Sequence, residues 1–399
     1  MRILLSAFHC NPYWGSEPGT GWHWATQLAA SGHEVTVLTV DEMRDYINRA
    51  NPDPRIDFQY VPLADVPLHR LSGPAGLYRR YMRWQDSAYE HIRSREREFD
   101  VAHHVTWGGL HLGSTLWRLS SVPLIYGPIG GGQVAPSGYR HYFGSSWPAE
   151  VARTLATRPL LPLNARCKRT LRHAALTLVC NSETASACRR LGAKDVRFMM
   201  ADGLAPDAIG AVRSQPTGIP LIIYIGRLIP RKAPQLAIEG FAALRRTTEA
   251  RMVVAGQGSL RGELEAMAKR LGVDRDVEFL GNIPLPEVRA LYDSASVLLF
   301  TSLRESFGSP IMESLGRGLP AVSLKLHGLA DADTGTAVEK IPLPASPNDL
   351  PGHLADGLRR VLSDGNWQSR SADGIKFASN WTWPVKAGIA TEFYREVAR

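Results

Sequence analysis

The stretch VLLFTSLRESFGSPIME, residues 297–313, decides the fold class of this chain. It opens with an apolar run typical of a buried strand and ends inside a helix. Ser309 is a suitable N-cap for that helix, and Pro310 suits its first position. Gly318 can close the helix, and Pro320 prevents its continuation. A buried strand that runs directly into a helix predicts an α/β fold built on parallel sheets.

The same alternation of short apolar runs and amphipathic stretches recurs along the whole chain. In the first half we expect strands at residues 3–7, 34–40, 57–61, 101–105, 123–126, 176–180 and 196–200. A second series is expected at residues 220–226, 252–255, 277–280, 297–301 and 321–323. Between the two series lies a stretch with prolines, glycines and few large apolar residues, as linkers have.

The length of 399 residues exceeds what one hydrophobic core usually serves, so we expect two domains. We place the first domain at residues 1–205, the linker at 206–218 and the second domain at 219–383. A closing helix follows at residues 384–399.

The composition, 44% hydrophobic and 21% charged, is that of an ordinary globular protein. Apolar runs stop short of the ~18 residues that a membrane-spanning helix needs, and the first apolar run fits a buried strand better than a secretory signal. The four cysteines form no C-x-x-C pair, which fits reduced thiols. We therefore expect a cytoplasmic protein. The net charge of +8 predicts attraction to anions, whether nucleotide diphosphates, acidic lipid head groups or nucleic acids.

The helix that starts near Ser309 is well placed to bind an anion. Free backbone N–H groups at a helix N-terminus bind phosphate, and ligands of open α/β sheets collect at the carboxyl ends of the strands. We therefore expect Phe307, Gly308 and Ser309 to present their amides to a diphosphate.

Two carboxylates and two cations are expected at this edge of the second sheet. Glu305 precedes the helix and Glu313 lies on its first turn, so one can hold sugar hydroxyls and the other a ribose. Arg227 and Lys232 follow another apolar strand and can neutralise charge on a leaving nucleotide. Spacing alone leaves open the alternative that all four are solvated surface or helix-end charges.

A glycine-rich loop, WGSEPGTGW at residues 14–22, follows the first strand and precedes a helix expected at 22–30. Gly15, Gly19 and Gly21 let the backbone approach a ligand closely, and the following helix end favours an anion. A turn that serves only packing is the alternative.

In combination, these motifs resemble the retaining family-4 glycosyltransferases of GT-B architecture. The GRL sequence around Arg227, with Lys232, is similar to that family's cationic motif, and Glu305 and Glu313 are similar to its paired glutamates. The resemblance implies two Rossmann-like domains whose parallel sheets face one another across a cleft. It assigns the donor-sugar hydroxyls to Glu305, the ribose to Glu313 and the diphosphate to the two cations.

Other segments extend the resemblance along the chain. VAGQG at residues 254–258 and FLGN at 279–282 are similar to connecting strands of the family, and the second implies that Gly281 and Asn282 bind the donor near its base. The glycine-rich loop is implied to face the donor diphosphate and the acceptor. The segment from Trp381 onward resembles the family's C-terminal helix, which returns to the N-terminal domain.

The sequence departs from the family pattern in three places. Ala233 stands where glycine is common, and LHGL at residues 326–329 lacks a second glycine. Many relatives place a donor-contacting histidine where this chain has Gly127. His103 and His104 are therefore candidates for contact with the acceptor or the donor sugar, and imidazoles satisfied by backbone groups are the alternative.

The predicted function is transfer of a sugar from a UDP- or GDP-sugar to a hydroxyl of a glycan, glycolipid or natural product. The family implies retention of configuration, and catalysis needs no cofactor and no covalent nucleophile on this hypothesis. Asp331 and Asp333 are too few carboxylates to indicate a metal site, so we expect none to be required.

Basic residues at 79–83 and 153–172, with Tyr78, Tyr81 and Trp84 nearby, suggest peripheral contact with an anionic inner membrane face. A solvated helical face is the alternative. No nucleic-acid-binding module is present, so we expect no nucleic acid partner.

Two other functions compete with sugar transfer. An NAD(P)-dependent dehydrogenase is suggested by Asp41, which follows the second strand, but the glycine spacing does not fit a dinucleotide fingerprint. A non-catalytic protein that binds nucleotide sugars is the other alternative.

Overall fold

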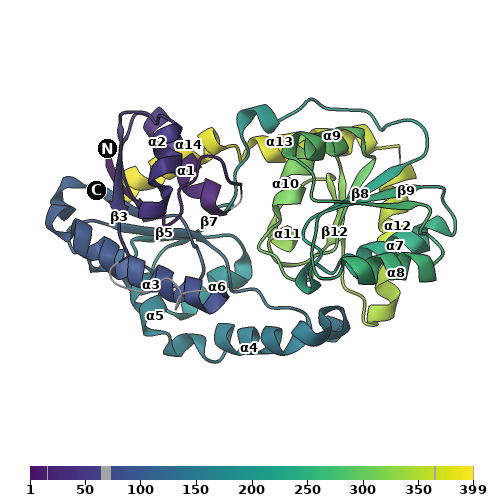
Figure 1. The fold of residues 1–399 in the computed structure, drawn as a ribbon, viewed down its shortest axis with the longest axis horizontal. Helices are drawn as coiled ribbons and strands as arrows, with labels where there is room; N and C mark the ends of the chain where they lie inside the picture. Colours follow the sequence, from purple (N-terminus) through teal and green to yellow (C-terminus); the bar gives the residue numbers. More distant parts are fainter. Residues whose placement is uncertain (16, 64–72, 364, 399) are drawn as a thin grey trace. The chain divides into compact units, whose positions relative to one another are not determined.

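The computed structural model describes residues 1–15, 17–63, 73–363 and 365–398. The chain forms two compact units (Figure 1). Unit 1 comprises Met1–Gly132, Ala156–Gly203 and Trp383–Arg399, and unit 2 comprises Gln133–Leu155 and Leu204–Thr382.

Two segments fall in unit 2 that the sequence places elsewhere. The proposed linker, residues 206–218, is tied to this unit by a hydrogen bond of 2.7 Å from the Gly210 amide to the Gly316 carbonyl. The segment Gln133–Leu155 was expected in the first domain. It belongs to unit 2 because its side chains bond to a helix and loops of that unit.

Unit 1 is built on a seven-stranded parallel sheet with the order β3-β2-β1-β4-β5-β6-β7. Its strands are β1 (Arg2–Ser6), β2 (Glu34–Val40), β3 (Ile56–Val61), β4 (Val101–His104), β5 (Leu124–Ile129), β6 (Leu176–Val179) and β7 (Val196–Phe198). Leu4 at the centre of β1 pairs in register with Thr36 on one side and Ala102 on the other. The central strands are almost wholly buried, as expected when helices cover both faces of a parallel sheet.

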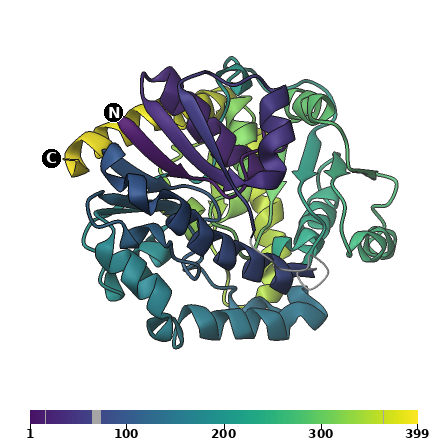
Figure 2. The same cartoon turned by 60° about the vertical axis from the view of Figure 1, so that its left-hand side comes forward.

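Helices lie on both faces of the unit 1 sheet, with α1, α2 and α14 on one face and α3, α5 and α6 on the other (Figure 1). Their bounds are α1 (Glu17–Ala30), α2 (Arg44–Arg49), α3 (Gly73–Ile92), α5 (Ala165–His173), α6 (Ser182–Arg190) and α14 (Trp383–Val397). The last helix of the chain packs against the first, α14 against α1, as Figure 2 also shows. The His33 Nε2 to Thr391 Oγ1 distance of 2.8 Å fixes that contact.

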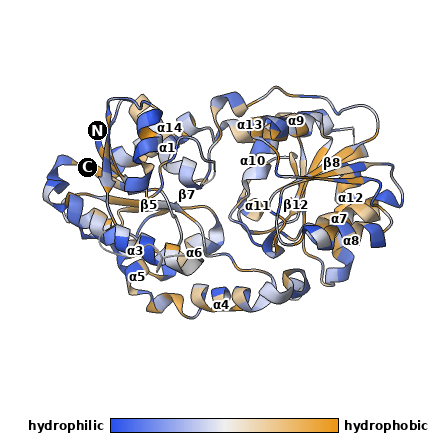
Figure 3. Ribbon diagram, viewed as in Figure 1, coloured by the Kyte–Doolittle hydropathy of each residue, from blue (hydrophilic) through white to orange (hydrophobic). Residues whose placement is uncertain are grey.

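Unit 2 contains a six-stranded parallel sheet with the order β10-β9-β8-β11-β12-β13. The strands are β8 (Leu221–Ile225), β9 (Arg251–Ala255), β10 (Val277–Gly281), β11 (Val297–Phe300), β12 (Ala321–Leu324) and β13 (Val338–Ile341). Hydrophobic residues concentrate in these strands (Figure 3). Helices again lie on both faces, with α7, α8 and α12 on one face and α9, α10 and α13 on the other (Figure 1).

The helices of unit 2 are α7 (Pro234–Arg245), α8 (Arg261–Arg270), α9 (Leu285–Ser294), α10 (Ser309–Gly316), α11 (His327–Asp331), α12 (Leu350–Ser363) and α13 (Trp367–Ser379). α4 (Trp147–Thr157) begins in unit 2 and ends in unit 1. Short 3-10 helices are η1 (Asp41–Met43), η3 (Arg93–Glu98), η4 (Leu116–Arg118), η5 (Ser137–Ser146), η6 (Leu161–Leu163), η7 (Pro206–Ala208), η8 (Pro230–Lys232) and η9 (Pro347–Asp349).

Two Rossmann-like α/β units with parallel sheets confirm the predicted fold class, and every expected strand is present to within three residues. The edge strand β13 was not expected, because VEKI is short and carries two charged residues. The helix expected from residue 22 begins at Glu17, five residues earlier. Gly308, not Ser309, is the N-cap of α10.

All four cysteines are buried, which leaves their thiols inert, and burial raises the pKa of Cys167, Cys180 and Cys188 to about 12. Within the described ranges, the helices are all too short or too polar to cross a bilayer.

Candidate active site

The chain reverses its direction of progress across the unit 2 sheet between β8 and β11, which lie side by side. Ligands of open α/β sheets bind at such a switch point, beyond the carboxyl ends of the strands. The loop after β8 carries Arg227 and Lys232, and the loop after β11 carries Glu305. The fold therefore brings together the cations and one of the two glutamates predicted from the sequence.

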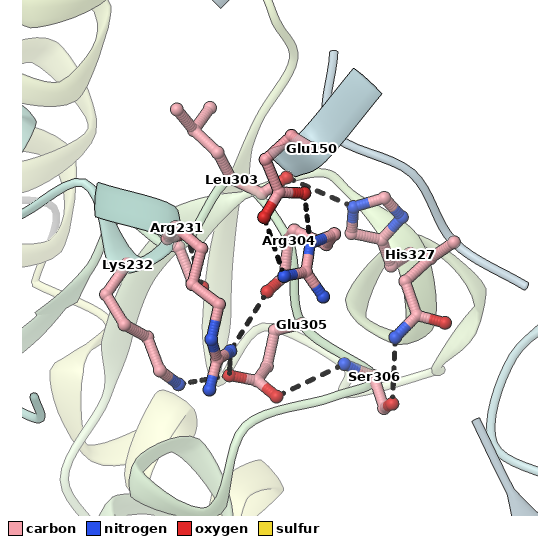
Figure 4. A network of polar contacts seen from close by, with 10 residues as sticks. Glu150, Arg231, Lys232, Leu303, Arg304, Glu305, Ser306 and His327 are labelled. Carbon is pink, nitrogen blue, oxygen red and sulfur yellow. Dashed lines mark hydrogen bonds and ion pairs between the residues drawn. The ribbon is translucent and has the colours of Figure 1, made fainter. Parts of the chain in front are cut away.

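Glu305 is held by two cations. Its Oε2 lies 3.1 Å from Arg231 Nη1 and also pairs with Lys232 Nζ (Figure 4). The side chains are largely enclosed, with exposures of 23% for Glu305 and 11% for Lys232. Arg231 lies in the GRLIPRK motif but was not singled out, because spacing does not show which of its basic residues faces the glutamate.

The ion cluster keeps Glu305 ionised. Burial alone raises the pKa of its carboxyl, but the charges of Lys232 and Arg231 outweigh burial and hold the pKa below its usual value. Burial lowers the pKa of Lys232, and Glu305 opposes that effect. A carboxylate that stays ionised accepts hydrogen bonds from hydroxyls and does not serve as a general acid.

Backbone contacts fix the two loops to each other. The amides of Leu303 and Arg304 donate to the Arg231 carbonyl at 3.1 and 3.3 Å. Thr301 Oγ1 donates to the Ala233 carbonyl at 2.9 Å. Ala233, which stands where glycine is common in the family, is buried and has φ 43°. This left-handed conformation costs an alanine about 1 kcal/mol.

The second departure, LHGL at residues 326–329, also supports the Glu305 loop. His327 Nε2 lies 3.2 Å from the Leu303 carbonyl, and the Gly328 amide donates to the Ser306 carbonyl at 3.0 Å. Together these bonds hold the loop on both sides of Glu305, and Figure 4 shows the one between His327 and Leu303.

The N-terminus of α10 follows directly. Gly308 has φ 114°, and a Cβ there would lie 2.5 Å from the Phe300 ring, so only glycine fits. Phe307 is buried and stacks on Phe377, with ring centroids 5.8 Å apart. Ser309 is the first residue of α10, so the predicted anion-binding amides lie at a helix N-terminus.

Glu313 is the fifth residue of α10 and is half-buried. The Tyr292 hydroxyl donates to Glu313 Oε2 at 2.8 Å. Burial and the adjacent carboxylate raise the pKa of Tyr292 well above its usual value, so it remains a donor. Tyr292, on α9, was not predicted, because it lies 21 residues from Glu313 in sequence.

Three further residues, predicted from the sequence to bind the donor, are Gly281, Asn282 and Arg227. Gly281 ends β10 with φ 73° and lies beside Arg261 and Gln257, and Asn282 follows it. Arg227 is exposed and makes no ion pair within the described part of unit 2. It is therefore accessible to a ligand.

The glycine-loop prediction needs correction. Gly15 precedes the helix, but Gly19 and Gly21 lie inside α1 and are buried. A Cβ would lie 2.3 Å from the Trp14 carbonyl oxygen at Gly19 and 2.5 Å from that of His9 at Gly21. Close packing, the alternative considered above, accounts for these two glycines.

The predicted ligand contacts of His103 and His104 are also not supported, because both rings lie in the core of unit 1. His103 Nδ1 lies 2.6 Å from the Tyr394 hydroxyl, and its Nε2 lies 2.7 Å from the Gly127 carbonyl. His104 Nε2 lies 2.8 Å from the Tyr81 hydroxyl. Burial lowers the pKa of His103 to about 3 and that of His104 to about 4, so both imidazoles are neutral structural groups.

Of the three aromatic residues considered for lipid contact, only Tyr78 is exposed. Tyr81 and Trp84 are fully buried and stack on each other at 6.1 Å. Among the described residues, His, Cys, Asp and Glu do not gather in groups of three or more that could hold a metal ion.

Comparison with known families gives two matches that together cover most of the chain. Residues 209–374 match the family described as glycosyl transferases group 1, and residues 19–201 match the glycosyl transferase 4-like domain. The chain is 26% identical to a D-inositol 3-phosphate glycosyltransferase of Corynebacterium efficiens, over 99% of this chain and 95% of that protein. These matches do not support a dehydrogenase. Asp41, which suggested one, is exposed and bonds to Arg44.

Solved structures agree on the fold. Sucrose-phosphate synthase from Thermosynechococcus elongatus superposes with a TM-score of 0.66 at 18% identity, covering 99% of this chain and 98% of that chain. Anabaena HepE in complex with UDP gives 0.66 at 14% identity, covering 99% and 100%. The chain belongs to the group 1, family-4 type of glycosyltransferases with GT-B architecture.

Proposed function

We propose that this glycosyltransferase binds a nucleotide-diphosphate sugar at the switch point of unit 2 and transfers the sugar with retention of configuration, without a metal ion. The observation that carries the proposal is the ionised Glu305, enclosed between Lys232 and Arg231 where β8 and β11 end. An anionic hydrogen-bond acceptor beside two cations suits the junction of a hydroxylated ring and a diphosphate.

Each part of the donor has a matching group. Glu305 accepts from sugar hydroxyls, and Glu313, oriented by Tyr292, accepts from the ribose. Arg227, Lys232 and the N-terminus of α10 stabilise the diphosphate as negative charge builds on it. Gly281 and Asn282 lie toward the base.

In the transfer step, the acceptor oxygen bonds to the anomeric carbon as the bond from that carbon to the diphosphate oxygen breaks. The released diphosphate oxygen takes the proton of the acceptor hydroxyl, so the products are the glycoside and the nucleoside diphosphate. Attack on the same face as departure gives retention. The protein contributes positioning and electrostatic stabilisation, and no side chain forms a covalent bond.

The donor and acceptor classes are chosen by chemistry and by the named relatives. HepE was crystallised with UDP, so UDP-sugars are the first donors to test, followed by GDP-sugars. The Corynebacterium relative is named for D-inositol 3-phosphate, which makes phosphorylated polyols the first acceptors, before glycans, lipid-linked sugars and natural products.

The experiment is a donor and acceptor screen followed by proton NMR of the product. We expect release of nucleoside diphosphate that depends on acceptor, and an anomeric coupling that matches the donor's. An inverted product contradicts retention. Donor binding without any turnover, with every acceptor tested, favours a non-catalytic binding protein.

We also propose peripheral contact with an anionic membrane through α3, where Tyr78, Arg79 and Arg83 are exposed. Sedimentation with anionic vesicles tests it. Wild-type protein should sediment, and Arg79→Glu with Arg83→Glu should stay in the supernatant. Equal sedimentation of both proteins contradicts this proposal.

A further inference from the structure

A second ion pair involves Arg304, the residue that directly precedes Glu305. Arg304 Nε and Nη2 donate to the two carboxylate oxygens of Glu150 at 2.7 and 2.8 Å (Figure 4). This bidentate pair is enclosed, with side-chain exposures of 14% for Arg304 and 11% for Glu150. Exposed ion pairs contribute little stabilising free energy, whereas an enclosed bidentate pair fixes the geometry of both side chains.

The residue on the other side of Glu305 is held from the same segment. Gln133 Nε2 donates to Ser306 Oγ at 3.0 Å, and the Gln133 side chain is buried. Arg304 and Ser306 flank Glu305 in sequence. The segment Gln133–Leu155 therefore holds both neighbours of the carboxylate that faces the donor.

Further bonds anchor this segment to unit 2. The Tyr142 hydroxyl donates to Glu239 Oε2 on α7 at 2.7 Å, and the Tyr139 hydroxyl donates to the Pro344 carbonyl at 3.2 Å. Glu150 and Gln133 therefore act from a segment that is itself hydrogen-bonded to other parts of unit 2. We call this segment, Gln133–Leu155, the brace.

The Arg304 backbone transmits this support to the ion cluster. Its amide donates to the Arg231 carbonyl, and its carbonyl accepts from Arg231 Nη1, both at 3.3 Å. A shift of Arg304 therefore moves Glu305 and one of the two cations that hold it. By contrast, Glu313 is oriented from another element, because it accepts a hydrogen bond from the Tyr292 hydroxyl on α9.

We propose that Glu150 and Gln133 are positioning residues for sugar transfer, which hold residues 304–306 so that Glu305 meets the donor sugar. The inference rests on the proposed function, because Glu305 has a role only if a donor sugar binds there. Neither residue touches the donor, since each acts through a neighbour of Glu305. Loss of the bonds from Glu150 or Gln133 should slow the reaction and leave the affinity for the nucleotide unchanged.

The test compares Glu150→Gln with Asp276→Asn. Asp276 also forms an ion pair, with Arg245 at 2.9 Å. It directly precedes β10, so it lies at the amino ends of the strands, whereas the proposed donor loops lie at their carboxyl ends. Glu150→Gln should lower kcat by about tenfold to a hundredfold, the scale of a misplacement near 1 Å. Its Kd for UDP should stay within about twofold of wild type, and Asp276→Asn should change neither quantity. Glu150→Asp, which keeps the charge, should recover part of the lost rate.

Gln133→Met supplies an uncharged variant if Glu150→Gln does not fold. Gln133→Met should lower kcat and leave the Kd for UDP unchanged. Ser306→Ala should add little to the effect of Gln133→Met, because the two substitutions remove the same hydrogen bond. The proposal is overturned if Glu150→Gln or Gln133→Met keeps wild-type kcat, or if Kd for UDP weakens in step with kcat. Wild-type protein without any transfer activity refutes the proposed function instead. Active wild type, inactive Glu305→Gln and fully active Glu150→Gln refute this inference alone.

Discussion

Glu305 and Glu313 are both carboxylates on one short stretch of chain, yet their surroundings differ. Glu305 is enclosed by Arg231 and Lys232, and Glu313 accepts from the Tyr292 hydroxyl. The first environment keeps a carboxylate ionised, so that it can accept hydrogen bonds from the hydroxyls of a sugar. The second orients a carboxylate through a hydrogen bond from a neutral hydroxyl. We infer that the two residues contribute to different parts of the reaction.

Substitutions should separate these contributions. Glu313→Ala and Arg227→Ala should weaken UDP binding about fivefold to tenfold, because each removes a contact worth roughly 1 kcal/mol. Glu305→Gln should leave UDP affinity nearly unchanged and lower turnover and sugar selectivity. Calorimetry with UDP and steady-state kinetics measure both. A larger loss of UDP affinity in Glu305→Gln than in Glu313→Ala contradicts the assignment.

Tyr292 should matter for nucleotide affinity although it lies outside the predicted motifs. Tyr292→Phe removes the hydroxyl that orients Glu313, and we expect UDP affinity to fall by about fivefold. Tyr394→Phe is the control, because it removes an equally buried hydroxyl that bonds to His103 in unit 1. Titration calorimetry that finds the same Kd for both variants shows that Tyr292 is a packing residue only.

Among the elements, helix α10 depends on the residue that precedes it. Gly308→Ala introduces a Cβ 2.5 Å from the Phe300 ring at φ 114°. We expect the free energy of unfolding to fall by about 1–3 kcal/mol and UDP affinity to fall with it, because the helix N-terminus must move. Gly262→Ala, in α8 with open space around it, is the matched control and should gain up to about 1 kcal/mol. Urea denaturation compares the two, and equal stability refutes the steric argument.

Helix α14 carries a fully buried lysine. Lys386 Nζ donates to the carbonyls of Ala201 and Asp202 at 2.9 and 3.0 Å and lies 4.2 Å from the centre of the Trp383 ring. Burial lowers the pKa of Lys386 to about 7, and the charge of Asp202 opposes that effect.

This pKa predicts a pH dependence of stability. Between about pH 7 and the unfolded pKa near 10.5, the unfolded chain binds more protons than the folded one, so Lys386 adds stability as pH rises. The slope for one group is at most about 1.4 kcal/mol per pH unit. Lys386→Met should lose this part of the slope. The check is urea unfolding of both proteins at pH 7 and pH 9, and parallel changes in the two contradict the prediction.

The strands were predictable because buried parallel strands are apolar runs, as in β8 and β11. Helix starts were less predictable, since glycines at 19 and 21 indicated a loop where packing against backbone oxygens requires them inside α1. The spacing of Glu305 and Glu313 indicated which loops form the proposed donor site, because it places both residues around the start of α10. The pair between Glu150 and Arg304 was beyond reach, because 154 residues separate its members and only the fold brings them together.

At the scale of the whole molecule, positive charge is abundant, with a net charge of +8. At the proposed donor site, Arg227, Arg231, Lys232 and the N-terminus of α10 supply the potential that other transferases obtain from a metal ion. We therefore expect full turnover in excess EDTA. Loss of nearly all activity on chelation, restored by Mg²⁺ or Mn²⁺, contradicts metal independence.

The division of the chain has a consequence for its biosynthesis. Unit 1 includes α14, which is synthesised after all of unit 2, and its core includes the contacts of His33 with Thr391 and of His103 with Tyr394. Unit 2 lies entirely between Gln133 and Thr382, so all of its residues are available before unit 1 is complete. Unit 1, whose first strands are made before unit 2, therefore completes its fold only after unit 2 has been made. A nascent chain stalled before α14 exposes the face of α1 that packs against α14 to chaperones and proteases.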